Sequence, residues 1–177
     1  MVTSERKRID ILVNTLIGGK NAASKETIIA ELVNAGLSAV EPLMRALCEH
    51  GRVDPSDYFK GTVILHPAVE VLSKIGEPAI PPLLNALIDE NQLIGRRAAE
   101  TLARIGNPVI KPLIALLVEK ASILNDTTLE TLLELLTSLE PPPEFLKSIE
   151  PLLLAIVLDG TSDQKKEMAK NLLSKLD

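Results

Sequence analysis

The residues best suited to chemistry form one small cluster. Cys48, Glu49 and His50 are consecutive, and His66 is the only other histidine among the 177 residues. A zinc site usually needs three or four ligands at recognisable spacing, which this sequence does not offer. A histidine at a helix end, interacting with the terminal carbonyls, is the simpler interpretation. The sequence therefore predicts neither a metal site nor a cofactor.

Two short segments approach catalytic motifs but lack required residues. The Gly-Gly-Lys at residues 18–20 approaches a phosphate-binding loop, yet Asn14 replaces the first glycine of that motif and Asn21 its final Ser or Thr. Ser38 follows a glycine as in a nucleophile elbow, but the closing glycine and a preceding strand are missing. We therefore expect a flexible linker and a turn at these places, no catalytic residue, and a non-enzymatic protein.

The composition limits the possible partners. Apolar residues make up 46% of the chain, aromatic residues only 2%, and the net charge is −5. Nucleic-acid binders usually need a basic stripe or aromatic platforms for stacking, so nucleic acid is not the expected partner. The longest apolar run, residues 151–158, is far shorter than the roughly 20 residues of a membrane span. The single Cys48 excludes an internal disulfide, and we expect a cytoplasmic protein without membrane contact.

An internal repeat organises the chain. A glycine followed six residues later by proline and leucine occurs at Gly36–Leu43, Gly76–Leu83 and Gly106–Leu113, and residues 149–152 keep the second half. Apolar residues at helical spacing precede each glycine, which can end a helix in the left-handed conformation. The proline is tolerated in the first turn of the following helix. Each unit is therefore predicted to be a helix, a tight turn and a second helix.

These signals predict an all-α fold. Ordering about 30 residues costs roughly 45 kcal/mol, which one hairpin cannot recover by burial, so the hairpins must stack on one another. We expect residues 1–177 to form a single domain, a right-handed α-α superhelix. Its expected parts are hairpins at about 24–50, 63–89, 92–120 and 126–159, with capping helices at 4–17 and 162–176.

The repeat signature resembles that of a known family. The pattern Gly-x-Pro-Ala-x-x-Pro-Leu is complete at Gly76–Leu83 and nearly so at Gly106–Leu113. It resembles HEAT-like repeats, especially the short repeats also found in phycobilisome lyases. Arg97 begins a segment similar to the first-helix motif of that repeat, whereas Thr27 and Pro67 depart from it in the other units. The resemblance implies a HEAT-like solenoid, an architecture that serves scaffolds, adaptors, lyase subunits and a few metalloenzymes.

Candidate binding residues come from the second helices. Positions one before, three after and seven after each anchor proline share a helix face, and second helices line the concave side of HEAT-type solenoids. We call this set the second-helix stripe: Glu41, Arg45, Glu49, Pro81, Asn85, Asp89, Lys111, Ala115, Glu119, Glu150, Leu154 and Leu158. Its five acids and two bases predict a mildly acidic groove for a polar or basic segment of a partner protein. The alternative is a solvated helix face in an acidic protein.

One insertion adds two further candidates. Residues 51–61 contain Tyr58, the only tyrosine, and Phe59. Loops on a rigid scaffold often carry binding residues, which makes both side chains candidate partner contacts. Alternatively, the two aromatic side chains fold back and cover part of the helical stack.

Three functions follow from these observations. The favoured interpretation is a non-enzymatic protein-binding scaffold or adaptor. The resemblance implies an alternative, a subunit or chaperone that attaches or detaches a bilin chromophore on phycobiliproteins. A third is DNA processing, because some HEAT-like solenoids are DNA glycosylases. Those enzymes present a basic concave face with aromatic residues, whereas the second-helix stripe is acidic.

Overall fold

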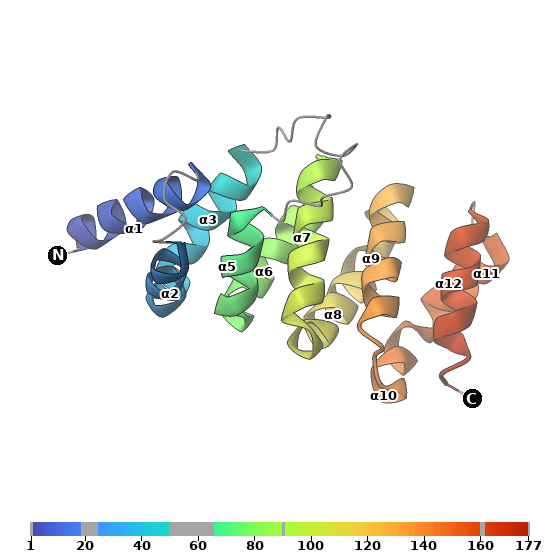
Figure 1. Ribbon diagram of the computed structural model, residues 1–177. Helices are drawn as coiled ribbons and strands as arrows, with labels where there is room; N and C mark the ends of the chain where they lie inside the picture. Colours follow the sequence, from blue (N-terminus) through green and yellow to red (C-terminus); the bar gives the residue numbers. More distant parts are fainter. Residues whose placement is uncertain (1, 19–24, 50–65, 90, 160–161, 177) are drawn as a thin grey trace. The chain divides into compact units, whose positions relative to one another are not determined.

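The computed structural model describes residues 2–18, 25–49, 66–89, 91–159 and 162–176, and the regular structure in these ranges is helical throughout (Figure 1). The predicted all-α fold class is confirmed. No single helix within the described ranges is long and apolar enough to cross a membrane. The chain divides into two compact units, Met1–Leu83 and Leu84–Asp177, which we describe in turn.

The first unit is built from α1 (Val2–Ile17), α2 (Lys25–Ala35), α3 (Leu37–Glu49) and α5 (Pro67–Ile75). Helix α1 contacts α2, α3 and α5, and α5 also packs against α2 and α3. The core is aliphatic, and its largest fully buried side chains are Leu32, Leu43, Leu47, Leu72 and Leu83. After a short 3-10 turn, Glu77–Ala79, helix α6 (Ile80–Leu87) contains the boundary between the units.

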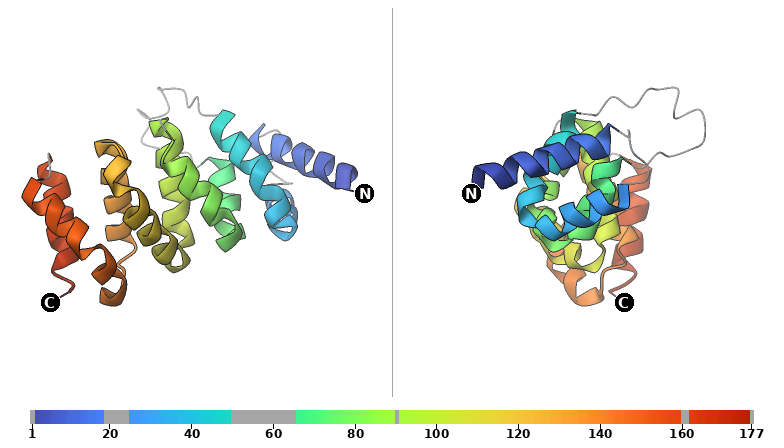
Figure 2. Two further views of the ribbon diagram at one scale, coloured as in Figure 1. Left: turned by 180° about the vertical axis from the view of Figure 1, so that it is seen from behind. Right: turned by 60° about the vertical axis from the view of Figure 1, so that its left-hand side comes forward.

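The second unit has two layers of helices. Helices α7 (Gln92–Ile105), α9 (Asp126–Ser138) and α12 (Asp163–Leu173) contact one another in sequence and form the layer nearest the viewer in Figure 1. Helices α8 (Ile110–Lys120) and α11 (Glu150–Asp159) form the other layer, which is nearest the viewer from behind in Figure 2. The largest fully buried side chains are again leucines: Leu102, Leu113, Leu117, Leu132, Leu133, Leu136 and Leu146.

The glycine turns differ in one respect from the prediction. Gly76 and Gly106 have positive φ values of 77° and 83°, as expected, but their ψ values of −132° and −140° are extended and not left-handed helical. Each glycine ends one helix and also caps the next 3-10 turn. Its amide donates to the carbonyl four residues earlier, and its carbonyl accepts from the amide three residues later. A positive φ with an extended ψ is accessible almost only to glycine.

The anchor prolines lie in the first turn of their helices with one exception. Pro82 and Pro112 are third in α6 and α8, and Pro151 is second in α11. Pro42 instead lies six residues into α3, so the prediction is wrong there. The physical reason is local, since Ser38 stands where the other turns have Pro78 and Pro108. Without that proline no separate 3-10 turn precedes the helix, and α3 begins directly after Gly36. Ser38 is therefore helical and not a turn residue.

The last predicted hairpin is also more broken than expected. The second half of the hairpin expected at 126–159 is divided into α10 (Pro143–Leu146), a 3-10 turn (Lys147–Ile149) and α11. The prolines at 141–143 and the 3-10 turn bend the chain before α11 begins. This break leaves α11 only ten residues long.

Candidate partner-binding surface

In the first unit, the second-helix stripe is held by ion pairs with α1. One guanidinium nitrogen of Arg6 lies 2.8 Å from both carboxylate oxygens of Glu41. Arg45 lies 3.9 Å from Asp10 and 4.0 Å from Glu41. All four side chains are at least partly exposed, so each pair contributes little to stability. Together they balance two bases against two acids, and this part of the stripe is not an acidic surface.

Several predicted contacts lie outside the described residues. Tyr58, Phe59 and His50 fall in residues 50–65, which the structure does not describe. Glu49 ends α3, but its side chain is also outside the described part. These positions remain predictions.

In the second unit, the stripe residues are exposed along α8 and α11. Lys111, Ala115 and Glu119 lie four residues apart on α8, and the ammonium of Lys111 lies 5.4 Å from the ring centroid of Phe145. That separation allows a cation–π interaction, which holds Lys111 against α10. Glu119 and Glu150 are exposed and form no ion pair with any residue that the structure describes. The stripe of this unit therefore contains three acids, Asp89, Glu119 and Glu150, and one base, Lys111, which already interacts with Phe145.

The stripe also has an apolar part that its pattern of charges does not reveal. On α11, Leu154 is 46% exposed and Leu158 is 79% exposed, while Leu153 and Ile156 on its other side are buried. Helix α11 is thus apolar on both its buried and its exposed sides. The signal was available in the sequence as the apolar run 151–158, but a run that is apolar all round does not reveal which side faces solvent.

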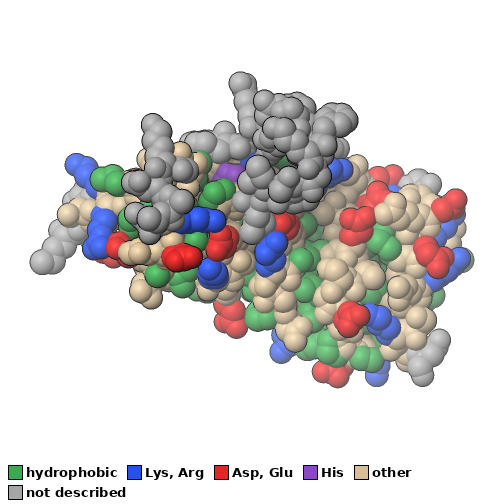
Figure 3. Space-filling view, viewed as in Figure 1, with side chains coloured by type: hydrophobic (Ala, Val, Ile, Leu, Met, Phe, Trp, Pro, Cys, Tyr) green, Lys and Arg blue, Asp and Glu red, His purple; other side chains and the backbone are tan. Residues whose placement is uncertain are grey.

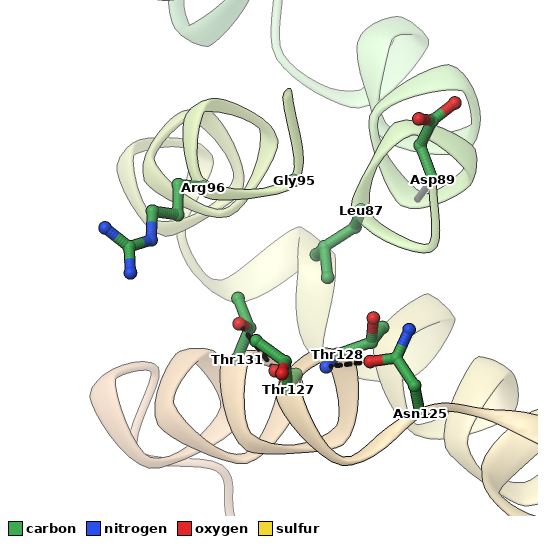
Figure 4. A pocket seen from close by; sticks show the side chains of 8 residues that line it. All are labelled: Leu87, Asp89, Gly95, Arg96, Asn125, Thr127, Thr128 and Thr131. Atoms are coloured by element: carbon green, nitrogen blue, oxygen red, sulfur yellow. Dashed lines mark hydrogen bonds between the residues drawn. The ribbon is translucent and has the colours of Figure 1, made fainter. Parts of the chain in front are cut away.

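Asn85 and Asp89, the remaining stripe residues of the second unit, are both exposed, and Asp89 lines a small hollow (Figure 4). The volume of this hollow is about 100 Å³, well below the roughly 300–1,000 Å³ of typical ligand pockets. Asn125 at its rim caps α9 by accepting a hydrogen bond from the Thr128 amide at 2.8 Å. The side chain of Arg96 points away from the hollow in Figure 4. The other lining residues are Leu87, Gly95, Thr127 and Thr131.

The opposite layer of the second unit presents a different surface. In the space-filling view of Figure 3, acidic and basic side chains are interspersed over α7, α9 and α12. Gln164 donates a 2.8 Å hydrogen bond to Glu134, and Lys165 pairs with Asp126, so polar side chains here join α12 to α9. This layer therefore uses its polar groups to hold its own helices together.

The histidine and cysteine candidates do not converge. His66 caps α5, with its Nδ1 accepting a 3.2 Å hydrogen bond from the Ala68 amide. Cys48 is exposed near the end of α3. Within the described ranges, no three His, Cys, Asp or Glu side chains gather closely enough to hold a metal ion.

Comparison with known families agrees with this architecture. Residues 62–138 match the family model of HEAT repeats. The matched segment contains the two best copies of the signature, and Arg97, which the resemblance singled out, is buried in α7. This match supports the HEAT-like repeats that the sequence predicts. The similarity to the short repeats of phycobilisome lyases stays a prediction. No curated protein and no solved structure matches the chain.

Proposed function

We propose that this chain is a non-enzymatic protein-binding scaffold or adaptor, which binds its partner through the exposed sides of its second helices. HEAT repeats commonly mediate interactions between proteins. The observation that carries the proposal is that α8 and α11 each have one side that packs into the core and one side that is exposed. Their inner sides bury Leu113, Leu117 and Leu153, which stabilise the fold, while the stripe side faces solvent. That outer side is available for binding.

The charges of the second unit favour a partner segment that is polar or basic. This unit holds fourteen acidic and ten basic residues, a net charge of −4, so it carries most of the chain's charge of −5. Glu119 and Glu150 are not neutralised by ion pairs with described residues. Complementary charges mainly accelerate association and select the partner. A chain with a single cysteine, Cys48, cannot form an internal disulfide, which fits a reducing compartment, and we place the protein in the cytoplasm.

Charge reversal on the stripe tests this function. The immobilised full-length chain is used to capture proteins from a lysate of the source cells, in parallel with the variant Glu119→Lys/Glu150→Lys. We expect the wild type to retain a specific protein that the variant retains several-fold less. For the recovered protein, association should be slower with the variant, and the difference should shrink at high salt.

The matched control is Glu167→Lys, because Glu167 is an exposed acid on α12, in the opposite layer of the same unit. This variant changes the net charge in the same direction and should capture like the wild type. A proportionate loss in Glu167→Lys, which changes the net charge half as much, would mean that only the overall charge matters. Equal capture by all three proteins would exclude the stripe as the binding surface.

A further inference from the structure

We infer that the exposed side of α11 binds an amphipathic helix of a partner protein, whose apolar row carries aliphatic side chains and whose flanks are basic. This inference rests on the proposed function and adds the secondary structure and chemistry of the bound segment. We call the surface the α11 face, and it consists of Pro151, Leu154, Ala155 and Leu158, with Glu150 at its beginning.

The α11 face is more apolar than the stability of the unit requires. The core side of α11 already contacts α12 and buries Leu153 and Ile156. Leu154 and Leu158 lie four residues apart on the other side, so their side chains are neighbours on one ridge of the helix. Grouped aliphatic side chains in water are typical of interaction sites, whereas scattered ones are not.

The geometry of the face favours a helix as its occupant. A ridge of side chains spaced four residues apart packs into the grooves of another helix. Apolar residues at helical spacing on the partner would contact Leu154 and Leu158 together. Addition of a strand would need the open edge of a sheet, and the described part of the chain contains no strand.

The charges around the face favour a basic occupant. Glu150 lies at one end of the face, and Glu119 is exposed on α8, the other helix of the same layer; neither pairs with a described residue. Lys111 is held over the Phe145 ring, and Lys147 is an exposed base three residues before Glu150, but the second unit as a whole carries a net charge of −4. A second copy of this chain would bring another net charge of −5 to the interface, which opposes self-association. A lysine- or arginine-flanked helix would instead neutralise these acids.

Synthetic peptides of leucine and lysine provide a direct test with the full-length chain. The first peptide places its leucines on one helical face, and the second has the same composition with leucines on all sides. A third keeps the first pattern but replaces lysine by glutamate. Binding is followed by fluorescence anisotropy. We expect the first peptide to bind about tenfold or more tightly than the other two, as burial of one leucine row implies.

Two variants assign the binding to the α11 face. Leu154→Ser/Leu158→Ser should weaken binding of the first peptide by about tenfold, because both leucines lose their contact with it. Ile11→Ser is the control, since Ile11 is an exposed aliphatic residue of α1 in the first unit, and this variant should bind like the wild type. Circular dichroism verifies that both variants keep their helices, as expected for substitutions at exposed positions.

Three results would overturn the inference. The first is unchanged peptide binding by the double leucine variant, and the second is equal binding of the glutamate peptide. The third is a dimer in sedimentation velocity that dissociates in the double variant, because the occupant would then be a second copy. In each case, lysate capture that still depends on Glu119 and Glu150 would leave the proposed function standing. Loss of that dependence as well would refute both proposals.

Discussion

The ammonium nitrogen of Lys165 lies 2.8 Å from a carboxylate oxygen of Asp126, and this ion pair joins the beginning of α12 to the beginning of α9. The pair is asymmetric, because the lysine side chain is only 3% exposed whereas the aspartate side chain is 69% exposed. Replacing Asp126 should therefore change the stability of the protein by a different amount than replacing Lys165. Without the lysine, the aspartate carboxylate is still exposed to water, whereas without the aspartate a buried ammonium group loses a carboxylate partner.

We predict that Asp126→Ala lowers the free energy of unfolding by about 1.5–3 kcal/mol, because it removes a charge-assisted hydrogen bond from a buried ammonium group. Lys165→Met should cost less, because methionine fills much of the same space without a charge. Urea denaturation measures both. Asp163→Ala is the control, since Asp163 holds the equivalent first position of α12 and its loss should cost less than about 1 kcal/mol. A larger cost for Lys165→Met than for Asp126→Ala would contradict this account.

Any side chain at the two turn glycines, Gly76 and Gly106, should lower the stability of the protein. A Cβ at Gly76 or Gly106 would meet no atom within 4 Å, so the cost of substitution is purely conformational. We expect Gly76→Ala and Gly106→Ala each to lower the free energy of unfolding by about 1–3 kcal/mol. Asparagine should not rescue these positions, because it favours left-handed helical ψ values and these are extended.

Gly36→Asn provides the comparison for this prediction. Gly36 has a φ value of 53°, which lies in the φ range of the left-handed helical region in which asparagine is tolerated. Thermal denaturation should show a smaller loss for Gly36→Asn than for Gly106→Asn. Equal losses would indicate that the extended ψ does not matter.

Glu140 follows α9 with a φ value of 49°, the only positive φ of a non-glycine residue among those described. A side chain in this region costs about 1–2 kcal/mol for residues other than glycine, asparagine and aspartate. We therefore expect Glu140→Gly to raise the free energy of unfolding by about 1 kcal/mol, partly offset by the greater entropy of the unfolded chain. Glu130→Gly, in the interior of α9, should instead lower it by about 1 kcal/mol. Denaturant titration of the two variants should give shifts of opposite sign.

Glu70 on α5 should make the stability of the first unit depend on pH. The hydrogen bond from Lys74 at 3.0 Å lowers the pKa of the Glu70 carboxyl, and Lys25 at 3.2 Å adds to this effect despite some opposition from burial. A lowered folded-state pKa stabilises the protein at pH values above the unfolded-state pKa of about 4.3. That stabilisation is lost as the pH falls through the lower folded-state value.

The measurement is the free energy of unfolding between neutral pH and about pH 3, compared for the wild type, Glu70→Gln and Lys74→Gln. Both variants should be less stable than the wild type at neutral pH and should lose less stability on acidification. Lys74→Gln removes the main cause of the shift and keeps the carboxyl. A wild-type pH dependence that persists in Glu70→Gln would show that other groups are responsible.

Much of the local structure follows from short-range effects that the sequence alone determines. Glycine and proline act on their own backbone and on immediate neighbours, so the turns at Gly76 and Gly106 and the helices beside them could be predicted closely. The exceptions have the same origin. Ser38, where the other turns have proline, moved the start of α3 and placed Pro42 inside the helix.

The candidate binding surface depends on tertiary structure, because exposure and pairing are decided by residues far apart in the sequence. Glu41 was predicted as an acidic contact, but Arg6, 35 residues earlier, neutralises it. Helix α11 is apolar on all sides, so its pattern could not distinguish Leu153 from Leu154. Only the packing of α11 against α12 decides which leucine is buried and which remains in water.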